Sequence, residues 1–395
     1  MNYLELTQGR LQQFRADVPK LIELGEKMAR PLLAGGGLFT PSIGTYWPSE
    51  FGGRAGGLMG LKPSHYVAQN ENDVAFTTLP DKRRWKASED ANWRKLIESK
   101  AQIFVIGSPG DVAGVEKVER FAGFTGGAGA EEGLGAKDDL QPLAPLRPFE
   151  QLVRGWVTAG EMIAAMTRGG RMPIIWMSVW LEGAFGRNAS FLKHDNLREP
   201  WYAPLFHEKI YIPPIEPGHV ADAFLTELER IHATLARQSD KLATAGQWMS
   251  DAVRERKQIS TVLVGHSYPQ ILELKDTSPY PLAWLPSISD LTHAHPADLG
   301  HGDVALHLGY SPVDVGDVER ILARGVRFIY TTPYGRPATL KDHKNLLWLD
   351  LPWRPADATV DVPGYSVRIL PMSSSAHTLA YFQMICELAT RMGWQ

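Results

Sequence analysis

Two short loops in this sequence combine a serine, a proline and an aspartate at the start of a predicted helix. Residues 108–111 read Ser-Pro-Gly-Asp and residues 311–314 read Ser-Pro-Val-Asp, and each loop follows an apolar run that predicts a buried strand. Small residues at such a turn let a ligand approach the backbone, while the first N–H groups of the helix attract an anion. Ser108, Gly110 and Ser311 are therefore candidate binding residues. The alternative interpretation is that serine and aspartate only cap the two helices.

The two loops belong to longer segments that match each other. Residues 108–118 and 311–321 are identical at six of eleven positions. Residues 44–48 likewise match 265–269, and 213–219 match 371–377 in spacing, in the same order along the chain. Matches of this kind predict an internal duplication. Residues 123–150 are rich in Gly, Ala and Pro, and we expect them to be an insertion or lid in the first half.

The elements that must position these loops alternate between helix and strand. Apolar residues at three-to-four spacing predict a helix over 3–33, and further helices are expected at 150–167, 220–256 and 376–392. Predicted strands lie at 38–40, 101–106, 173–178, 209–212, 259–264, 303–308, 326–330 and 346–349. This alternation favours parallel sheets with helices on their faces. We expect an α/β fold of two flavodoxin-like three-layer domains, 1–220 and 221–395.

Composition and charge limit the classes of function. The 395 residues are 44% hydrophobic with a formal charge of −3, so a core is expected and no basic surplus indicates nucleic acid as a partner. No run approaches ~18 apolar residues and the N-terminus does not resemble a secretory signal, so we expect a cytoplasmic protein with no membrane partner. The single cysteine, Cys386, leaves no internal disulfide. We expect no cofactor.

Three stretches together resemble one family. Residues 44–47 (Gly-Thr-Tyr-Trp) and 265–268 (Gly-His-Ser-Tyr) are similar to a Gly-Thr-Ser-Tyr loop after a first strand, and residues 50–58 (EFGGRAGGL) to a Glu-x-x-x-Arg-Ala-Gly-Gly-Leu run. Residues 371–375 resemble the approach to a last helix. These are motifs of SIS (sugar isomerase) domains, which occur in tandem in the isomerase half of glucosamine-6-phosphate synthase. The resemblance implies two SIS-type domains and a sugar or sugar phosphate as ligand.

The resemblance also implies an aldose–ketose isomerase, in which a base moves a proton between adjacent carbons and an acid helps to open the ring. Glu50 matches the family's glutamate and is the candidate base; the alternative is a surface ion pair with Arg54, four residues later. His219 and His377, at the starts of matched helices, are candidate acid–base partners or only cap and pack there. The implied substrate-binding residues are Ser42, Thr45, Tyr46, Arg54, Ser108, Gly110, His266, Ser267 and Ser311.

The sequence departs from the family at its phosphate loop, Ser-x-Ser-Gly-x-Thr. Each half keeps one serine, and Asp111 and Asp314 lie near where a phosphate-binding hydroxyl is expected. A carboxylate beside a phosphate dianion is unfavourable unless a cation intervenes. The ligand could therefore be an unphosphorylated sugar or an amino sugar. Two alternative functions also remain: a non-catalytic sugar-responsive regulator, and a lyase or etherase that acts on a phosphorylated amino sugar. Assembly into a homo-oligomer is also open.

Two further expectations concern position. The histidines at 293, 295, 301 and 307 form the densest group of that residue, but Pro296, Gly300 and Gly302 indicate a loop, so no metal is expected there. Ligands bind at the carboxyl ends of parallel strands. We therefore expect the ligand site between the two halves, lined by the loops at 44–50, 108–111, 266–268 and 311–314.

Overall fold

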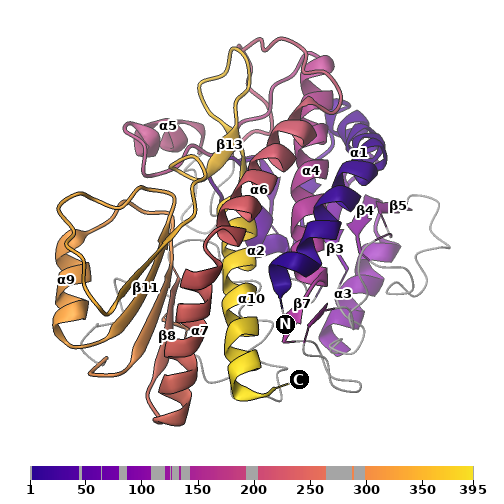
Figure 1. Cartoon of the computed structure of the whole chain (residues 1–395). Helices are drawn as coiled ribbons and strands as arrows, with labels where there is room; N and C mark the ends of the chain where they lie inside the picture. The colour runs from indigo at the N-terminus through magenta and orange to yellow at the C-terminus, as the bar shows by residue number, and fades with distance from the viewer. Residues whose placement is uncertain are drawn as a thin grey trace.

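Two parallel β-sheets lie on opposite sides of a group of long helices (Figure 1). The computed structural model describes residues 2–43, 47–63, 65–79, 87–107, 121–124, 126, 133–134, 143–192, 203–263, 287–288 and 299–394. This arrangement of parallel sheets and covering helices confirms the predicted α/β fold class.

The two sheets have the same strand order. The first runs β2-β1-β3-β4-β5 and the second, read from its other edge, β9-β8-β10-β11-β12. With the strands of each sheet numbered in chain order, both follow the flavodoxin-like order 2-1-3-4-5. The strands of the first sheet are β1 (Leu38–Phe39), β2 (Leu61–Lys62), β3 (Val74–Thr78), β4 (Gln102–Ile106) and β5 (Phe121–Phe124). Those of the second are β8 (Ile259–Leu263), β9 (Ser287–Ile288), β10 (Val304–Leu308), β11 (Arg327–Thr332) and β12 (Leu346–Asp350).

The helices between the sheets hold the main core. They are α1 (Tyr3–Leu33), α4 (Arg147–Arg168), α6 (His219–Ala236), α7 (Ser239–Arg254) and α10 (Ser373–Met392). Helix α1 begins where the Asn2 side chain accepts a hydrogen bond from the Glu5 amide, 3.2 Å away. Its apolar residues recur every three or four positions and face α4, which is buried along nearly its whole length. One hydrophobic cluster joins residues of both halves through these helices.

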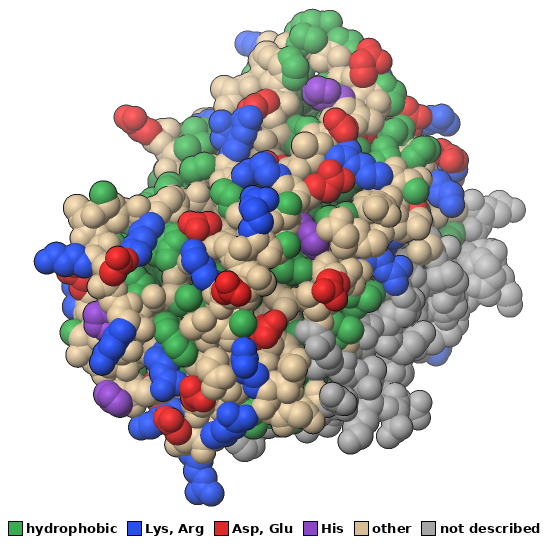
Figure 2. All heavy atoms as spheres, in the orientation of Figure 1, with side chains coloured by type: hydrophobic (Ala, Val, Ile, Leu, Met, Phe, Trp, Pro, Cys, Tyr) green, Lys and Arg blue, Asp and Glu red, His purple; other side chains and the backbone are tan. Residues whose placement is uncertain are grey.

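Smaller elements complete the structure. Helix α3 (Ala87–Glu98) and helix α9 (Val315–Ala323) accompany two smaller hydrophobic clusters, one on each sheet. The remaining elements are α2 (Trp47–Phe51), α5 (Ala184–Phe191), the pair β13 (Ala358–Val360) and β14 (Ile369–Pro371), and the pair β6 (Gly133–Leu134) and β7 (Ala144–Pro145). On the face shown in Figure 2, Lys and Arg side chains alternate with Asp and Glu without a large area of one sign. Within the described ranges, no helix has the length and hydropathy needed to cross a membrane.

The predicted insertion at 123–150 is wrong at both of its described ends. Phe124 ends strand β5, while residues 144–145 form β7 and α4 begins at residue 147. Leu143, Leu146 and Phe149 are buried in the main core because this segment leads into the central helix. The greater part between these ends, 127–132 and 135–142, lies outside the described residues.

The predicted strands at 173–178 and 209–212 are also wrong. The first contributes only isolated bridges, Leu58 with Ile175 and Pro173 with Phe206, and the second is irregular. The helix expected over 220–256 is two helices, α6 and α7. Strand β3, at the centre of the first sheet, was not predicted.

The missing strand changes how the two serine loops compare. Ser311 follows β10, the third strand and the centre of its sheet, whereas Ser108 follows β4, which is next to the centre of the other sheet. The two loops are therefore not at equivalent positions in the two sheets. The segment that corresponds to the Ser311 loop in sheet position follows β3, where residues 80–86 lie outside the described ranges.

Candidate functional site

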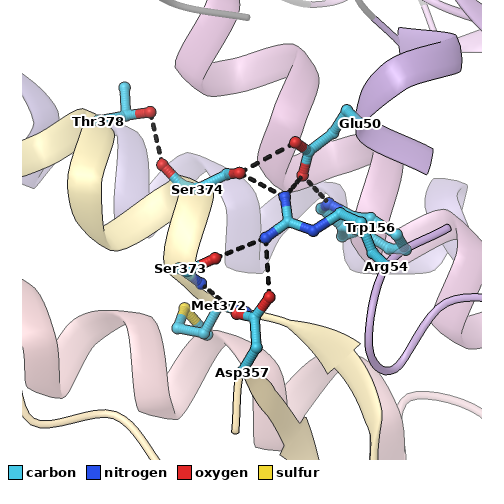
Figure 3. A network of polar contacts seen from close by, with 8 residues as sticks. All are labelled: Glu50, Arg54, Trp156, Asp357, Met372, Ser373, Ser374 and Thr378. Atoms are coloured by element: carbon cyan, nitrogen blue, oxygen red, sulfur yellow. Dashed lines mark hydrogen bonds and ion pairs between the residues drawn. The ribbon is translucent and has the colours of Figure 1, made fainter. Parts of the chain in front are cut away.

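A buried arginine joins segments that are far apart in the sequence. Helix α2 carries Glu50, and Arg54 follows it after a turn at Gly52-Gly53. The Arg54 side chain is completely buried and Glu50 is 2% exposed. Around them lie Ser373 and Ser374 at the start of α10, and Asp357 just before β13 (Figure 3).

Each end of the Arg54 guanidinium contacts one carboxylate and one hydroxyl. Its Nη1 donates to Glu50 Oε1 and to Ser374 Oγ. Its Nη2 donates to Asp357 Oδ2 at 2.9 Å and to Ser373 Oγ at 2.5 Å. Both carboxylates hold further donors, because Trp156 Nε1 lies 2.8 Å from Glu50 Oε1 and the Ser373 amide lies 2.8 Å from Asp357 Oδ1. Such a fork of donors holds its partners in fixed directions.

The charges of this network shift one another's pKa values. Burial alone would lower the pKa of Arg54, but the charges of Glu50 and Asp357 outweigh burial and raise it. Burial raises the pKa of Glu50, and Arg54 with its hydrogen-bond donors only partly offsets this. Burial also acts to raise the pKa of Asp357, but Arg54 and the hydrogen bonds from Ser373 outweigh it and hold this pKa below its usual value.

The hydrogen bonds of Glu50, the predicted base, involve both of its carboxylate oxygens. Both oxygens of Glu50 accept hydrogen bonds from protein groups, Oε1 from Arg54 and Trp156 and Oε2 from Ser374 at 2.9 Å. The predicted ion pair with Arg54 therefore exists, but it is buried rather than at the surface. The sequence signalled Glu50 and Arg54 by their spacing; it did not signal Asp357, which is more than three hundred residues away.

A cavity of about 360 Å³ lies beside the Ser311 loop, where the chain passes from β10 into α9. Its wall combines residues of β10, β11, the loop and α9 with one residue of the first half. The lining residues are Trp180, His307, Ser311, Pro312, Val313, Asp314, Asp317, Val318, Ile321, Phe328 and Tyr330. The cavity thus lies at the carboxyl end of a parallel strand, where such sheets bind ligands.

Flat rings form one side of this cavity. His307 stacks on Tyr330 with ring centroids 4.1 Å apart and an interplanar angle of 9°. Tyr330 in turn stacks on Trp348 of the next strand at 5.0 Å and 11°. Trp180, which is 44% exposed, comes from the turn before α5, and Figure 1 shows that helix above the second sheet.

Carboxylates and a hydroxyl form the polar part of the wall. Asp314 caps helix α9 by accepting a hydrogen bond from the Asp317 amide at 3.0 Å, so the expected cap is present for the aspartate of this loop. Ser311 is half-buried, and its carbonyl accepts a hydrogen bond from Thr332 Oγ1 at 3.3 Å. The Ser311 hydroxyl and the Asp314 carboxylate lie in the same wall as the stacked rings.

Tyr310 interacts both with Trp180 of the cavity wall and with charged residues of the Arg54 network. Burial and the charge of Asp357 raise the pKa of Tyr310 to about 12, against the opposing effects of Arg54 and of a hydrogen bond with the Trp180 side chain. His377 of α10 is 1% exposed, and burial lowers its pKa to about 3 despite the charge of Asp357 and a hydrogen bond with the Gly309 backbone. The cavity, Tyr310 and the network are therefore neighbours.

The structure brings together only some of the predicted site residues. Glu50, Arg54 and His377 belong to the buried region around Asp357, and Ser311 lines the cavity. His219 is exposed at the start of α6, where Glu161 accepts hydrogen bonds from the Gly218 and Ala221 amides, and Ser42 is also exposed. The predicted residues outside the described ranges are Thr45, Tyr46, Ser108, Gly110, His266 and Ser267.

The predicted histidine group is not brought together as a metal site in the described part of the chain. Residues 293 and 295 lie outside it, His301 is exposed in the turn before β10, and His307 is buried within β10. Among the described residues, no three His, Cys, Asp or Glu side chains are arranged to hold a metal ion.

Comparison with solved structures returns matches of low sequence identity. No family model and no curated protein matches the sequence. The C-terminal domain of glucosamine-fructose-6-phosphate aminotransferase from Francisella tularensis matches with 12% identity over 97% of this chain and 96% of that chain, at a TM-score of 0.48. A putative phosphosugar isomerase from Salmonella typhimurium matches with 12% identity over 94% and 93%, at 0.46.

A third structure matches only part of the chain. It is the sugar isomerase domain of an RpiR transcription factor from Sphaerobacter thermophilus, with 16% identity over 44% of this chain and 91% of that chain, at a TM-score of 0.29. These are structures of the kind that the sequence motifs resemble. At such identities and TM-scores below 0.5, they carry no conclusion about what this chain binds or catalyses.

Proposed function

We propose that this protein binds a sugar in the cavity beside Ser311. The observation that carries the proposal is the combination, in one cavity, of stacked aromatic rings with a hydroxyl and carboxylates. The ring of Trp180, which is 44% exposed, suits the C–H face of a sugar, and Ser311 and Asp314 suit its hydroxyls. A volume of about 360 Å³ falls within the ordinary range for small-molecule sites.

The charges around the cavity favour a sugar without a phosphate at this position. Asp314 and Asp317 are in the wall, and its lining residues in the described chain include no Lys or Arg. Arg320, a basic residue of α9, pairs with Asp317 at the surface. A phosphate dianion would meet two carboxylates here, which is unfavourable by Coulomb repulsion. An uncharged sugar or an amino sugar avoids that cost.

The contacts of Glu50 favour binding over isomerisation. An isomerase, a lyase and an etherase acting on a sugar all require a base that reaches a carbon-bound proton. Both Glu50 oxygens are occupied by Arg54, Trp156 and Ser374, and Glu50 is not part of the Ser311 cavity. We therefore favour a sugar-responsive binding protein over the isomerase that the sequence resemblance implies.

The test is a calorimetric titration of the whole chain with D-glucose, D-galactose, D-mannose, D-glucosamine and the 6-phosphates of glucose and glucosamine. We expect at least one neutral or amino sugar to bind more tightly than its phosphate. Trp180→Ala should weaken that binding about tenfold, because it removes an aromatic wall of the cavity. Phe185→Ala is the matched control, since Phe185 is 72% exposed in the same segment and does not line the cavity. Preferential binding of the phosphates, or full affinity in Trp180→Ala, would contradict the proposal.

A further inference from the structure

His307 is a buried histidine in the wall of the Ser311 cavity. It is 1% exposed and lies on β10, with its ring held flat against Tyr330. It lies on the same face of the strand as Ala305, which packs under α9, whereas Leu306 and Leu308 belong to the central core. The rest of the strand is apolar or small, so a polar ring at this position is not required for packing.

The two ring nitrogens of His307 have different surroundings. Nδ1 lies 3.2 Å from the Thr331 carbonyl oxygen, which can only accept a hydrogen bond. Nδ1 must therefore carry the proton in the neutral ring, which leaves a lone pair on Nε2. Nε2 is buried and has no hydrogen-bond partner within the described part of the chain. A buried acceptor of this kind costs free energy unless something bonds to it.

We propose that His307 Nε2 accepts a hydrogen bond from a hydroxyl group of the sugar in the Ser311 cavity, and so selects for that hydroxyl. This inference rests on the proposed function, because it takes the cavity as the sugar site. Two other polar side chains of the wall, Asp314 and Asp317, also accept hydrogen bonds. A wall of acceptors matches a ligand rich in hydroxyl or ammonium donors.

The role of His307 is binding rather than proton transfer. Burial lowers the pKa of His307 to about 4, so the ring stays neutral at pH 7. A group with that pKa is a weak base and would remove a carbon-bound proton poorly. A neutral imidazole is instead a good fixed acceptor, and its stacking on Tyr330 fixes its direction.

The experiment combines His307→Phe with monodeoxy sugars. Phe keeps a flat ring against Tyr330 and removes the acceptor. For D-glucose, D-galactose and D-mannose, we expect one monodeoxy analogue to bind wild-type protein about tenfold more weakly than its parent, because Nε2 then lacks its partner. His307→Phe should bind that analogue and the parent equally. His343→Phe, which changes an exposed histidine outside the cavity, should behave as wild type.

A second measurement does not depend on a variant. In ¹⁵N-labelled wild-type protein, the Nε2 resonance of His307 should shift when the parent sugar is added, and less when the analogue is added. If the parent sugars bind and neither the resonance nor the His307→Phe affinity changes, this inference is wrong while the proposed function stands. If no sugar of the panel binds, the proposed function fails and this inference fails with it.

Discussion

At the scale of single residues, the Arg54 network shows what sequence spacing can and cannot predict. The four-residue spacing of Glu50 and Arg54 predicted their pairing. It did not predict their burial, because burial depends on Ser373, Ser374 and Asp357 from the far end of the chain. The same limit applies to His307, whose importance comes from the β11 ring that it stacks on. Contacts between distant segments carry no local signal.

Removing Arg54 should destabilise the protein strongly. Arg54→Met leaves Glu50 and Asp357 buried without their cation, so we expect a loss of about 3–5 kcal/mol in the free energy of unfolding at pH 7. Glu50→Gln keeps the shape and should lose about 1–3 kcal/mol while sugar affinity is unchanged. Urea denaturation and calorimetric titration measure the two quantities.

The control for this pair is Arg230→Met, which removes an exposed partner of Glu227 and should cost less than about 1 kcal/mol. If Arg54→Met lowered the free energy of unfolding no more than Arg230→Met does, a structural role for the network would be contradicted. Glu50→Gln that abolished a sugar isomerase activity without loss of stability would restore Glu50 as the base.

His377 should make the protein sensitive to mild acid. Its pKa is near 6.5 when unfolded and is lowered to about 3 in the folded protein, so the unfolded chain binds a proton first as the pH falls. Its contribution to stability is complete above pH 6.5 and is lost toward pH 3, by about 1 kcal/mol per pH unit. His307, with a folded pKa of about 4, acts in the same direction. The groups that act on His377 are Asp357, His307 and Arg54.

Urea denaturation between pH 7 and pH 5.5 measures this effect. The free energy of unfolding should fall more steeply with decreasing pH in wild type than in His377→Phe, whereas His343→Phe should keep the wild-type slope. Equal slopes in wild type and His377→Phe would show that His377 titrates normally in the folded protein.

At the scale of elements, the long helices and most strands were predicted because each carries its own period of apolar residues. Helix α1 matches its predicted range of 3–33, and β10, β11 and β12 match within a few residues. Strand β3 was missed, although Val74-Ala75-Phe76-Thr77-Thr78 contains three β-branched residues, because the run is only five residues long and two of them are polar threonines. Because β3 was not predicted, the two serine loops were matched although they follow non-equivalent strands. The apolar run at 173–178 is largely buried without pairing in a sheet, which periodicity alone cannot reveal.

Helix α1 approaches α4 closely at Gly25. A Cβ at this position would lie 2.7 Å from the Met162 backbone nitrogen, so Gly25→Ala forces the two helices apart. We expect it to destabilise the protein by about 1–3 kcal/mol. Gly9 lies in the same helix, and a methyl group added there would have no neighbour within 4 Å, so Gly9→Ala should stabilise by about 0.5–1 kcal/mol through helix propensity. Thermal unfolding of both variants tests this, and a stabilising Gly25→Ala would show that the helices are farther apart than described.

At the scale of the whole molecule, the two sheets share one core. The N-terminal helix α1 contacts the C-terminal helix α10, where Tyr3 packs on Phe382 and the Leu4 amide donates to Gln383 Oε1 at 3.0 Å. The predicted division at residues 220 and 221 falls inside the first turn of α6. The two sheets share a strand order, but the matched serine loops are not equivalent, so the duplication stays a prediction. The shared core indicates that the halves depend on each other.

Separate halves should therefore not fold independently. In residues 1–220 alone, the faces of α1 and α4 that contact α6 and α10 would be exposed to water. We expect this fragment to lack a cooperative thermal transition by circular dichroism, while the full chain unfolds in one. A fragment that unfolds cooperatively near the transition temperature of the full chain would show that the first half is an independent domain.

The central claim is that the cavity beside Ser311 is a sugar site. Its most direct test is a crystal structure of the protein with the neutral or amino sugar that binds most tightly in the titration. We predict density for the sugar in the Ser311 cavity against Trp180, with one hydroxyl within hydrogen-bond distance of His307 Nε2 and the Glu50–Arg54 pair intact. A sugar bound elsewhere, or one that displaces Arg54 to reach Glu50, would contradict the account.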